Sequence, residues 1–363
     1  MQYKLENSWQ EILKNIELLK FDFKNIINLK NKNIALYGAG RYGKVALKYL
    51  KKQGYNIVCF IDNSPQKQGT EIDEIPVVSI NHFIIKSVDF VFITIKGFEF
   101  KSEVAIKNMS FDAWYIVKNI DKYEHIRNNI FCDDSSKQTL DGVLLSILTN
   151  DKKYYSLIMD FNQYFCLPYF RNNSNEYFVD VGSYIGDSIE KFIWANDGIF
   201  KQIIAFEPGV KQYNASKKRI LRLVEEWALN SETISVINAG VADKEGSAHV
   251  DLSQTELPSL NLMVDKTNDE TSSIKITTLD KQLENVPVTF IKADIEGMEM
   301  AMLRGAKETI LKNKPKLAIC VYHNINDLIE VIGFLQAIVP NYKMALRHHS
   351  HLHSETVLYC WIE

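Results

Sequence analysis

The stretch Glu176-Tyr177-Phe178-Val179-Asp180-Val181-Gly182-Ser183-Tyr184-Ile185-Gly186-Asp187-Ser188 decides how the second half of this chain folds. It begins as an apolar run rich in β-branched and aromatic residues, reaches a carboxylate, passes two glycines and opens into an amphipathic stretch that continues to Ala195. This pattern predicts a strand, a tight turn and a helix. The glycines allow the backbone to turn sharply and to approach a ligand closely, while the helix directs its positive end toward the same place.

The carboxylate of Asp180 indicates which kind of ligand this turn holds. It argues against the pyrophosphate of a dinucleotide and suits a ligand that combines positive charge with hydroxyl or amino donors. S-adenosylmethionine (SAM) fits that description. We therefore expect the amino-acid portion of SAM to be bound by the residues of the turn, which are Asp180, Gly182, Ser183, Tyr184, Gly186 and Asp187.

Length, composition and charge exclude several classes of protein. The chain has 363 residues, of which 46% are hydrophobic and 24% are charged, so it is long enough for two globular domains. A formal net charge of -3 gives no electrostatic footprint for nucleic acid. We expect neither a signal peptide nor a membrane span, because the apolar runs are too short. The five cysteines are scattered and never in Cys-x-x-Cys spacing, so we expect reduced thiols and a cytoplasmic protein.

A second glycine-rich loop lies near the N-terminus, after a helical stripe at Leu5 to Leu29 and a predicted strand at Asn33 to Tyr37. A predicted helix ending at Gln53 and a strand at Asn56 to Ile61 follow it. That second strand ends at an acidic residue, where the ribose partner sits in dinucleotide-binding proteins. We predict a nucleotide site made of Gly38, Gly40, Gly43 and Asp62, and two further strands at Val88 to Ile95 and Trp114 to Val117.

This first unit resembles the small Rossmann-like domains of sugar-modifying enzymes, including the acetyltransferases of bacterial sugar biosynthesis. The resemblance rests on the Gly-x-Gly loop and on the strand end Ile61-Asp62-Asn63-Ser64-Pro65. It implies a nucleotide-type ligand or a vestigial site. Nicotinamide-dependent redox chemistry is the alternative, but the unit is short of the two half-folds of a full dinucleotide site.

The remainder of the chain is predicted to alternate strands and helices after a helical connector. We divide the sequence into an N-terminal helix (1–30), a Rossmann-like domain (31–118), the connector (119–176) and a second α/β domain (177–363). The connector is rich in tyrosine and phenylalanine, which we expect to pack it onto the second domain, substrate stacking being the alternative.

The second domain is predicted to hold a parallel sheet with helices on both faces and an antiparallel final pair of strands. Its main helix after the fourth strand is predicted at Met298 to Lys312. A hairpin is expected between Ala248 to Leu252 and Ile274 to Thr277. The predicted strands are Tyr177 to Val181, Gln202 to Phe206, Ile234 to Asn238, Val288 to Ala293, Lys316 to Tyr322, Tyr342 to Arg347 and Thr356 to Trp361.

Four strands of this domain end in polar residues or a glycine turn, and the carboxyl ends of parallel strands meet at one edge of a sheet. Glu207, followed by Pro208, is placed to accept both hydroxyls of a ribose. The backbone near Ala239 is expected to border the adenine, and Asp294 completes the predicted cofactor site. Each acid taken singly has the alternative of capping a helix or closing a turn.

Several segments together resemble the FkbM-type methyltransferases, over about the last half of the chain. The resemblance implies a class I methyltransferase fold and SAM-dependent O-methylation of a hydroxyl on a sugar, sugar nucleotide or polyketide-type metabolite, in surface polysaccharide or natural-product biosynthesis. It implies a small-molecule or saccharide acceptor, and it leaves a homodimer open. The segments are Phe178 to Ser188, Ala205 to Pro208, Phe290 to Glu299, Tyr322 to Asn324, Leu346 to His349 and Glu355 to Tyr359, with Asp133 to Ser136 in the connector.

Methylation of an alcohol requires a base, whereas an aromatic amine hardly does. We predict that Asp294 lies beside the methyl group, with Glu296 as a further catalytic residue. His323, neutral near pH 7, is predicted to be the general base or to be oriented by Asp294 for that role. A structural hydrogen-bonding role is the alternative for this histidine.

Four histidines lie in one loop near the C-terminus, at positions 348, 349, 351 and 353. His349, His351 and His353 share a face if the loop is extended, and with Asp294 they suggest a divalent metal. Polar hairpin residues explain them more simply, so we predict no metal site. Two other classes of function stay open: a nicotinamide-dependent oxidoreductase that uses the N-terminal glycine loop, and a catalytically silent nucleotide-binding protein.

Overall fold

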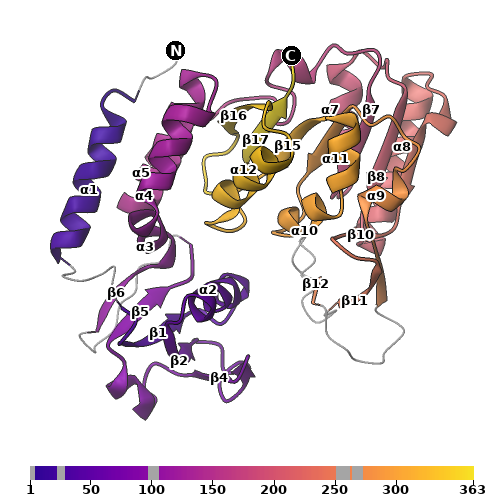
Figure 1. Cartoon of the computed structure of the whole chain (residues 1–363). Coiled ribbons are helices and arrows are strands. Elements are labelled where there is room, and N and C mark those ends of the chain that lie inside the picture. Colours follow the sequence, from indigo (N-terminus) through magenta and orange to yellow (C-terminus); the bar gives the residue numbers. More distant parts are fainter. Residues whose placement is uncertain (1–4, 23–28, 97–105, 251–261, 264–272) are drawn as a thin grey trace. The chain divides into compact units, whose positions relative to one another are not determined.

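The computed structural model describes residues 5–22, 29–96, 106–250, 262–263 and 273–363 (Figure 1). The chain consists of two compact units. Unit 1 comprises Met1–Arg127 and Leu140–Ile158, and unit 2 comprises Asn128–Thr139 and Met159–Glu363. Within the described residues, no helix combines the length and the apolar character that crossing a bilayer requires.

Unit 1 is built on a six-stranded sheet in the order β3-β4-β2-β1-β5-β6. Neighbouring strands pair in parallel, except that β3 is antiparallel to β4. The glycine loop joins β1 to α2 (Arg41–Lys52), which confirms the predicted strand, loop and helix. The helix predicted near the N-terminus is α1 (Ser8–Asp22), and its predicted residues 23–28 lie outside the described part. The strands are β1 (Asn33–Tyr37), β2 (Asn56–Ile61), β3 (Glu71–Ile72), β4 (Ile75–Val78), β5 (Phe90–Ile93) and β6 (Lys107–Ser110).

One strand predicted for this unit is wrong. The residues Trp114 to Val117 lie in helix α3 (Phe111–Lys118), and the strand that pairs with β5 is β6. The hydroxyl of Ser110 caps α3 by accepting the Ala113 N–H at 3.4 Å. The helix is buried on nearly every side, so it lacks the polar face that identifies a helix in sequence, and its apolar run reads as a strand.

The segment between the two sheets is helical, as predicted, and its aromatic residues divide between two cores. Tyr154 and Tyr155 are buried in unit 1, whereas Tyr164, Phe165 and Phe170 belong to the core of unit 2. The helices are α4 (Ile120–His125), a π-helical turn (Ile126–Ile130), α5 (Asp134–Thr149), α6 (Lys153–Ile158) and a 3-10 turn (Pro168–Phe170).

Unit 2 is built on a seven-stranded sheet in the order β16-β17-β15-β14-β7-β8-β9. The strands pair in parallel except for β17, which is antiparallel to both β15 and β16, as predicted for the last pair. The strand order reverses between β7 and β14, because β8 and β9 follow on one side and β15 on the other. The strands are β7 (Tyr177–Val181), β8 (Gln202–Phe206), β9 (Ile234–Ile237), β14 (Phe290–Ala293), β15 (Lys316–Cys320), β16 (Lys343–His348) and β17 (Thr356–Trp361).

The helices of unit 2 include one correction. The predicted helix Met298 to Lys312 is two helices, α10 (Glu299–Arg304) and α11 (Lys307–Asn313), which separate at Gly305. The Gly305 carbonyl accepts the Asp280 N–H at 2.9 Å, and a Cβ at this position would lie 2.0 Å from the Ala242 carbonyl oxygen. Close tertiary contact therefore interrupts the helix. The other helices are α7 (Asp187–Ala195), α8 (Val210–Glu226), α9 (Leu279–Gln282) and α12 (Asp327–Ile338).

A four-stranded second sheet contains the predicted hairpin. Its order is β10-β13-β11-β12, and β11 (Gly246–Val250) pairs antiparallel with β13 (Ser273–Thr277) as predicted. The predicted end of the hairpin at Leu252 lies outside the described residues. The two remaining strands are β10 (Gly240–Val241) and β12 (Leu262–Met263).

Aromatic packing fixes the first strand and helix of unit 2. The rings of Phe178 on β7 and Phe192 on α7 stack with their centroids 4.2 Å apart, and Phe290 on β14 lies 4.9 Å from Phe178. All three side chains are fully buried. The turn between β7 and α7 is therefore held between two rigid elements, which positions its backbone for the site described next.

Candidate active site

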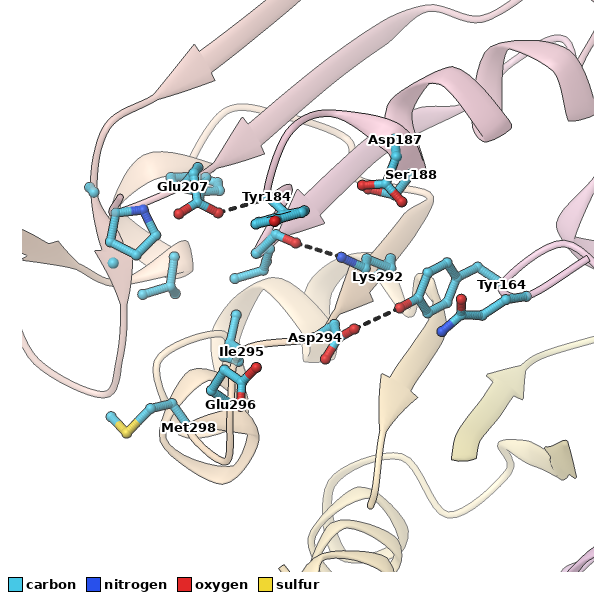
Figure 2. A pocket seen from close by; sticks show the side chains of 18 of the residues that line it. Tyr164, Tyr184, Asp187, Ser188, Glu207, Lys292, Asp294, Ile295, Glu296 and Met298 are labelled. Carbon is cyan, nitrogen blue, oxygen red and sulfur yellow. Dashed lines mark hydrogen bonds between the residues drawn. The ribbon is translucent and has the colours of Figure 1, made fainter. Parts of the chain in front are cut away.

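A cavity of about 390 Å³ opens at the carboxyl ends of the strands of the unit 2 sheet, where the strand order reverses (Figure 2). Its walls are formed by residues at the ends of β7, β8 and β14, by the link from β9 to β10, and by the segments that follow β15 and precede β17. Gln163 and Tyr164 complete it. The volume falls in the range that accommodates a cofactor-sized ligand.

The turn after β7 forms one wall of this cavity. Gly182 has a φ of 78°, and a Cβ at this position would lie 2.0 Å from the Asp294 carbonyl oxygen. Glycine is thus required for the turn to pack against the end of β14. Of the residues predicted to hold SAM here, Gly182, Tyr184 and Asp187 line the cavity. Asp180, Ser183 and Gly186 are not among the lining residues, and the first two are fully buried.

Asp180 does not line the cavity itself, but two residues that bind its carboxylate do. Its carboxylate forms an ion pair with Lys292 at 2.9 Å and accepts the hydroxyl of Ser188, both of which line the cavity. The side chains of Asp180 and Lys292 are 0% and 3% exposed. Lys292 Nζ also donates to the Gly182 carbonyl at 2.7 Å (Figure 2). Asp180 therefore holds the turn and the lysine in place, and it does not face a ligand directly.

Lys292 is a residue of the site that we did not predict. Burial by itself would lower the pKa of this lysine, but the charge of Asp180, with that of Asp294, outweighs burial and raises it. The amine is therefore charged within the cavity wall. A signal was present in the sequence, because a lysine interrupts the apolar strand Phe290–Ala293, and β-strand register places it directly opposite Asp180.

Glu207 and its neighbours form the wall opposite the lysine. The carboxylate of Glu207 is held by two backbone donors, the N–H groups of Tyr184 and Gly209, both at 2.8 Å. Asn238 Nδ2 donates to the carbonyls of Glu207 and Pro208, which fixes the link after β9. Burial raises the pKa of Glu207 to about 7. The predicted residues Glu207, Pro208 and Ala239 all line the cavity.

The raised pKa of Glu207 predicts that SAM affinity depends on pH. Only the ionised carboxylate accepts hydrogen bonds from both ribose hydroxyls, so affinity should rise as the pH increases through about 7 and level off above it. Glu207→Gln should weaken SAM binding by about 10- to 100-fold, which corresponds to about 1.5–3 kcal/mol, and should remove the pH dependence. Calorimetric titration with SAM between pH 6 and pH 8 measures both effects. A pH profile that is the same for the variant and the wild type would exclude Glu207 from the ribose site.

Asp294 faces the cavity and is oriented by two tyrosines. Its Oδ2 accepts the Tyr164 hydroxyl at 2.9 Å, and its Oδ1 accepts the Tyr322 hydroxyl at 3.2 Å. Tyr164 comes from the segment whose aromatic residues we expected to pack onto the second domain. Its side chain is buried in the core of unit 2, and it also lines the cavity. Glu296, in the turn after β14, lines the cavity as well.

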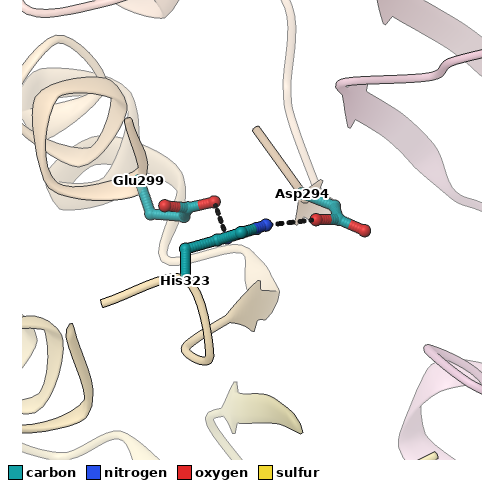
Figure 3. A group of neighbouring side chains, drawn as sticks. All are labelled: Asp294, Glu299 and His323. Atoms are coloured by element: carbon teal, nitrogen blue, oxygen red, sulfur yellow. Dashed lines mark ion pairs between the residues drawn. The ribbon is translucent and has the colours of Figure 1, made fainter. Parts of the chain in front are cut away.

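His323 lies behind this wall and is not among the residues that line the cavity. Its Nδ1 is 2.9 Å from Glu299 Oε1, and its Nε2 is 3.5 Å from Asp294 Oδ1 (Figure 3). The Nε2 atom is also 3.7 Å from Glu296 Oε2. Burial alone would lower the pKa of His323, but Glu299, followed by Asp294 and Glu296, outweighs burial and raises it. This direction opposes the neutral imidazole that we expected near pH 7.

The histidines of the C-terminal loop have structural partners instead of a place in the cavity wall. His348 Nδ1 lies 2.8 Å from the Thr356 hydroxyl, and His349 Nε2 lies 2.9 Å from the Tyr359 hydroxyl. Burial lowers the pKa of both histidines to about 4. Neither lines the cavity. His348 thus belongs to the buried end of β16, and the role of the loop histidines stays a prediction.

The N-terminal glycine loop is stabilised by its own acidic residue. Asp62 accepts the N–H groups of Ala39 at 2.8 Å and Ser64 at 2.9 Å, and it pairs with Lys67 at 3.1 Å. A Cβ on Gly43 would lie 2.0 Å from the Gly38 carbonyl oxygen, so close packing of α2 on the turn requires that glycine. Hydrogen bonding thus explains Asp62, and close packing explains Gly43, without a ligand. A nucleotide ligand at this loop stays a prediction.

A doubly wound sheet whose order reverses beside a glycine turn, with an acidic residue at the end of the next strand in the same cavity, is the arrangement in which open α/β sheets bind nucleotide-type ligands. The fold is that of a class I methyltransferase. Comparison with protein families narrows the class further. Residues 180–344 match the model of the methyltransferase FkbM domain, and residues 30–117 match the model described as C2185-like, N-terminal. The chain is a SAM-dependent methyltransferase, and its C-terminal part is similar to the FkbM methyltransferases.

The fold is similar to that of a solved methyltransferase structure over nearly the whole chain. The crystal structure of methyltransferase FkbM from Methylobacillus flagellatus KT is 21% identical, with a TM-score of 0.62 over 98% of this chain and 99% of that chain. An rRNA methylase from Streptococcus thermophilus is 13% identical, with a TM-score of 0.32 over 58% of this chain and 94% of that one. SMU.1697c from Streptococcus mutans, a putative methyltransferase in complex with SAH, is 12% identical, with a TM-score of 0.31 over 52% and 89%. A search of curated proteins finds no significant match.

Proposed function

We propose that this protein transfers the methyl group of SAM to a hydroxyl of a sugar, a sugar nucleotide or a related metabolite. The observation that carries the proposal is the position of Asp294, whose carboxylate lines the cavity and is held there by two tyrosine hydroxyls. The turn after β14 contains a second lining carboxylate, Glu296. Carboxylates suit an acceptor whose hydroxyl must lose a proton.

The cavity wall suggests how SAM is bound. Glu207 would accept the two ribose hydroxyls, and the backbone near Ala239 would border the adenine. The turn at Gly182 and the charged amine of Lys292 would face the methionine portion, whose carboxylate is attracted by the lysine. This assignment places the sulfonium between the ends of β7 and β14, which are adjacent in the sheet.

Methyl transfer then requires that the acceptor hydroxyl is aligned with the methyl group and loses its proton. The acceptor oxygen forms a bond to the methyl carbon as the carbon–sulfur bond breaks, and the electron pair of that bond stays on sulfur, giving S-adenosylhomocysteine. The acceptor's proton passes to one of the two lining carboxylates, Asp294 or Glu296. His323 acts as a positioning residue, because Asp294 and Glu296 lie between its ring and the cavity.

The rim of the cavity supports a polyhydroxylated acceptor. Tyr322 and Glu355 both line it, with the Tyr322 hydroxyl 3.5 Å from Glu355 Oε1, and Gln163 donates to the same carboxylate. Hydroxyl, amide and carboxylate groups so close together offer several donors and acceptors to the hydroxyls of a sugar. The FkbM resemblance of these segments points to the same class of acceptor.

Titration with two cofactors tests this proposal against its alternatives. We expect one equivalent of SAM to bind and Glu207→Gln to weaken it, while NADH gives no heat of binding. The matched variant Asp62→Asn, in the N-terminal loop, should leave SAM affinity unchanged. Binding of NADH that is abolished by Asp62→Asn, with none of SAM, would favour an oxidoreductase. SAM binding without formation of S-adenosylhomocysteine from any of a panel of sugars and sugar nucleotides would favour a catalytically silent protein.

A further inference from the structure

Three side chains with metal-ligand atoms meet beside the cavity, where Asp294, Glu299 and His323 converge from three elements (Figure 3). Asp294 follows β14, Glu299 begins α10 and His323 lies shortly after β15. One ligand atom from each lies within 4.8 Å of the others. Small side-chain movements would bring all three atoms to about 2.0–2.2 Å from one ion, the distance that such ligands adopt.

Three buried polar atoms of this group, the two ring nitrogens of His323 and Oε2 of Glu299, have no hydrogen-bond partner within the described residues. His323 is 2% exposed, and neither of its ring nitrogens makes a hydrogen bond within the described part of the chain. Glu299 is 1% exposed, and its Oε2 likewise makes none there. The short distances from the ring to the carboxylates are those of ion pairs. Buried nitrogen and oxygen atoms without hydrogen bonds are rare in folded proteins and point to a bound ion.

The local charge favours a cation. Glu296 lies 3.7 Å from His323 Nε2, so three carboxylates surround one imidazole. Carboxylates crowded in a buried site repel one another, and a divalent cation relieves this repulsion more effectively than a single proton.

We propose that Asp294, Glu299 and His323 bind a divalent cation that accepts mixed oxygen and nitrogen ligands, with Mn²⁺ as the closest chemical match. Two carboxylates and one imidazole suit Mn²⁺ or Zn²⁺ better than Ca²⁺, which prefers oxygen alone. This ligand set differs from the histidine loop considered from the sequence, and it replaces our expectation of no metal.

The role of the cation rests on the proposed methyl transfer. Asp294 has one oxygen toward His323 and the other toward Tyr164 at the cavity. A cation on the first oxygen would lie behind the cavity wall and would hold the second oxygen in place to accept a hydrogen bond from the acceptor hydroxyl. With Asp294 occupied as a ligand, the acceptor's proton would pass to Glu296 as the acceptor oxygen attacks the methyl carbon.

Direct metal binding by the intact chain tests the site without SAM or acceptor. Protein without a histidine tag is treated with a chelator, dialysed and titrated with Mn²⁺, while electron paramagnetic resonance follows the free ion. We expect about one tightly bound equivalent, and we expect Glu299→Gln and His323→Gln to weaken it by at least tenfold. Glutamine at position 299 can still accept the Ile295 N–H, which Glu299 accepts at 3.0 Å, so the local turn should persist.

Matched variants outside the group provide the control. Glu308→Gln on α11 and His125→Gln on α4 change the same residue types at exposed positions and should bind Mn²⁺ as the wild type does. A thermal shift provides a second measurement, since an ion that binds only the folded protein raises Tm. Wild-type protein that binds no Mn²⁺ or Zn²⁺, or variants that bind as tightly as the wild type, would overturn the site. Intact SAM binding in those samples would leave the methyltransferase proposal standing.

Discussion

Asp294→Asn is expected to lower kcat by about 10²- to 10⁴-fold while leaving the Kd for SAM within about threefold of the wild type. The carboxylate lines the cavity, and its proposed role is to receive the acceptor's proton or to align the acceptor hydroxyl for Glu296. Asparagine keeps an acceptor for the hydroxyls of Tyr164 and Tyr322, so the wall should retain its shape. Formation of S-adenosylhomocysteine with a sugar-nucleotide acceptor gives kcat, and calorimetry gives Kd.

His323→Gln and Glu308→Gln separate catalysis from general disturbance. His323 acts through its carboxylate neighbours, so its loss should reduce kcat and shift the pH dependence of kcat, with little change in the KM for SAM. Glu308 is exposed on α11 and should have no effect on either quantity. If the Asp294 variant kept wild-type turnover, the carboxylate would have no part in the chemistry, and the assignment of the acceptor site would be wrong.

Lys292→Met is expected to destabilise unit 2 by about 3–5 kcal/mol, because it leaves the carboxylate of Asp180 buried without its partner. The same change removes the donor to the Gly182 carbonyl, so the turn that faces SAM should loosen and SAM affinity should fall. Denaturation in urea measures the loss, provided that a probe reports on unit 2 separately, since a chain of two units need not unfold in one step. Hydrogen exchange of the amides of β7 and β14 offers such a probe, because both strands belong to the sheet of unit 2, whereas tryptophan fluorescence would also report on Trp9 and Trp114 in unit 1.

Two further variants test whether loss of the ion pair is the reason for the lower stability expected of Lys292→Met. Asp180→Asn combined with Lys292→Met removes both charges, and asparagine can still accept the Ser188 hydroxyl, so part of the lost stability should return. The ion pair of Lys281 with Glu245 is exposed on both sides, and Lys281→Met should cost at most about 1 kcal/mol. Equal losses in the single and double variants would show that the ion pair itself is not what the lysine contributes.

Asp180 is an exception to the inference that acidic residues at the ends of parallel strands line the ligand site. The rule that acids at the ends of parallel strands meet at one place holds for Glu207 and Asp294, which line one cavity. It does not hold for Asp180, which lies one residue before the end of β7 and points to Lys292 instead. The position of an acid along its strand could be read from the residues, but the lysine across the sheet could not, because strand pairing is a long-range property.

The errors in the predicted helices and strands also arise from burial and from contacts between segments that are distant in the sequence. The helix at Phe111–Lys118 was taken for a strand because its burial removes the polar face on which helical periodicity depends. The break at Gly305 depends on a carbonyl from a distant loop that approaches the glycine. Tyr164 was expected only to pack, since nothing in its neighbourhood along the chain indicates that it contacts Asp294, 130 residues away.

What the amino-acid sequence alone determined was the order of the main strands and helices in unit 2, the first strand, glycine loop and helix of the unit 1 sheet, the glycine turn after β7, the kind of cofactor and the resemblance to the FkbM methyltransferases. These follow from local patterns of apolar residues, glycines and acids, which act over a few residues. Only the tertiary structure decided which carboxylates reach the cavity, that Lys292 carries its charge there, and that His323 lies behind Asp294 between three acidic groups. Burial and pairing across the sheet set these features, because they depend on which distant segments become neighbours when the chain folds.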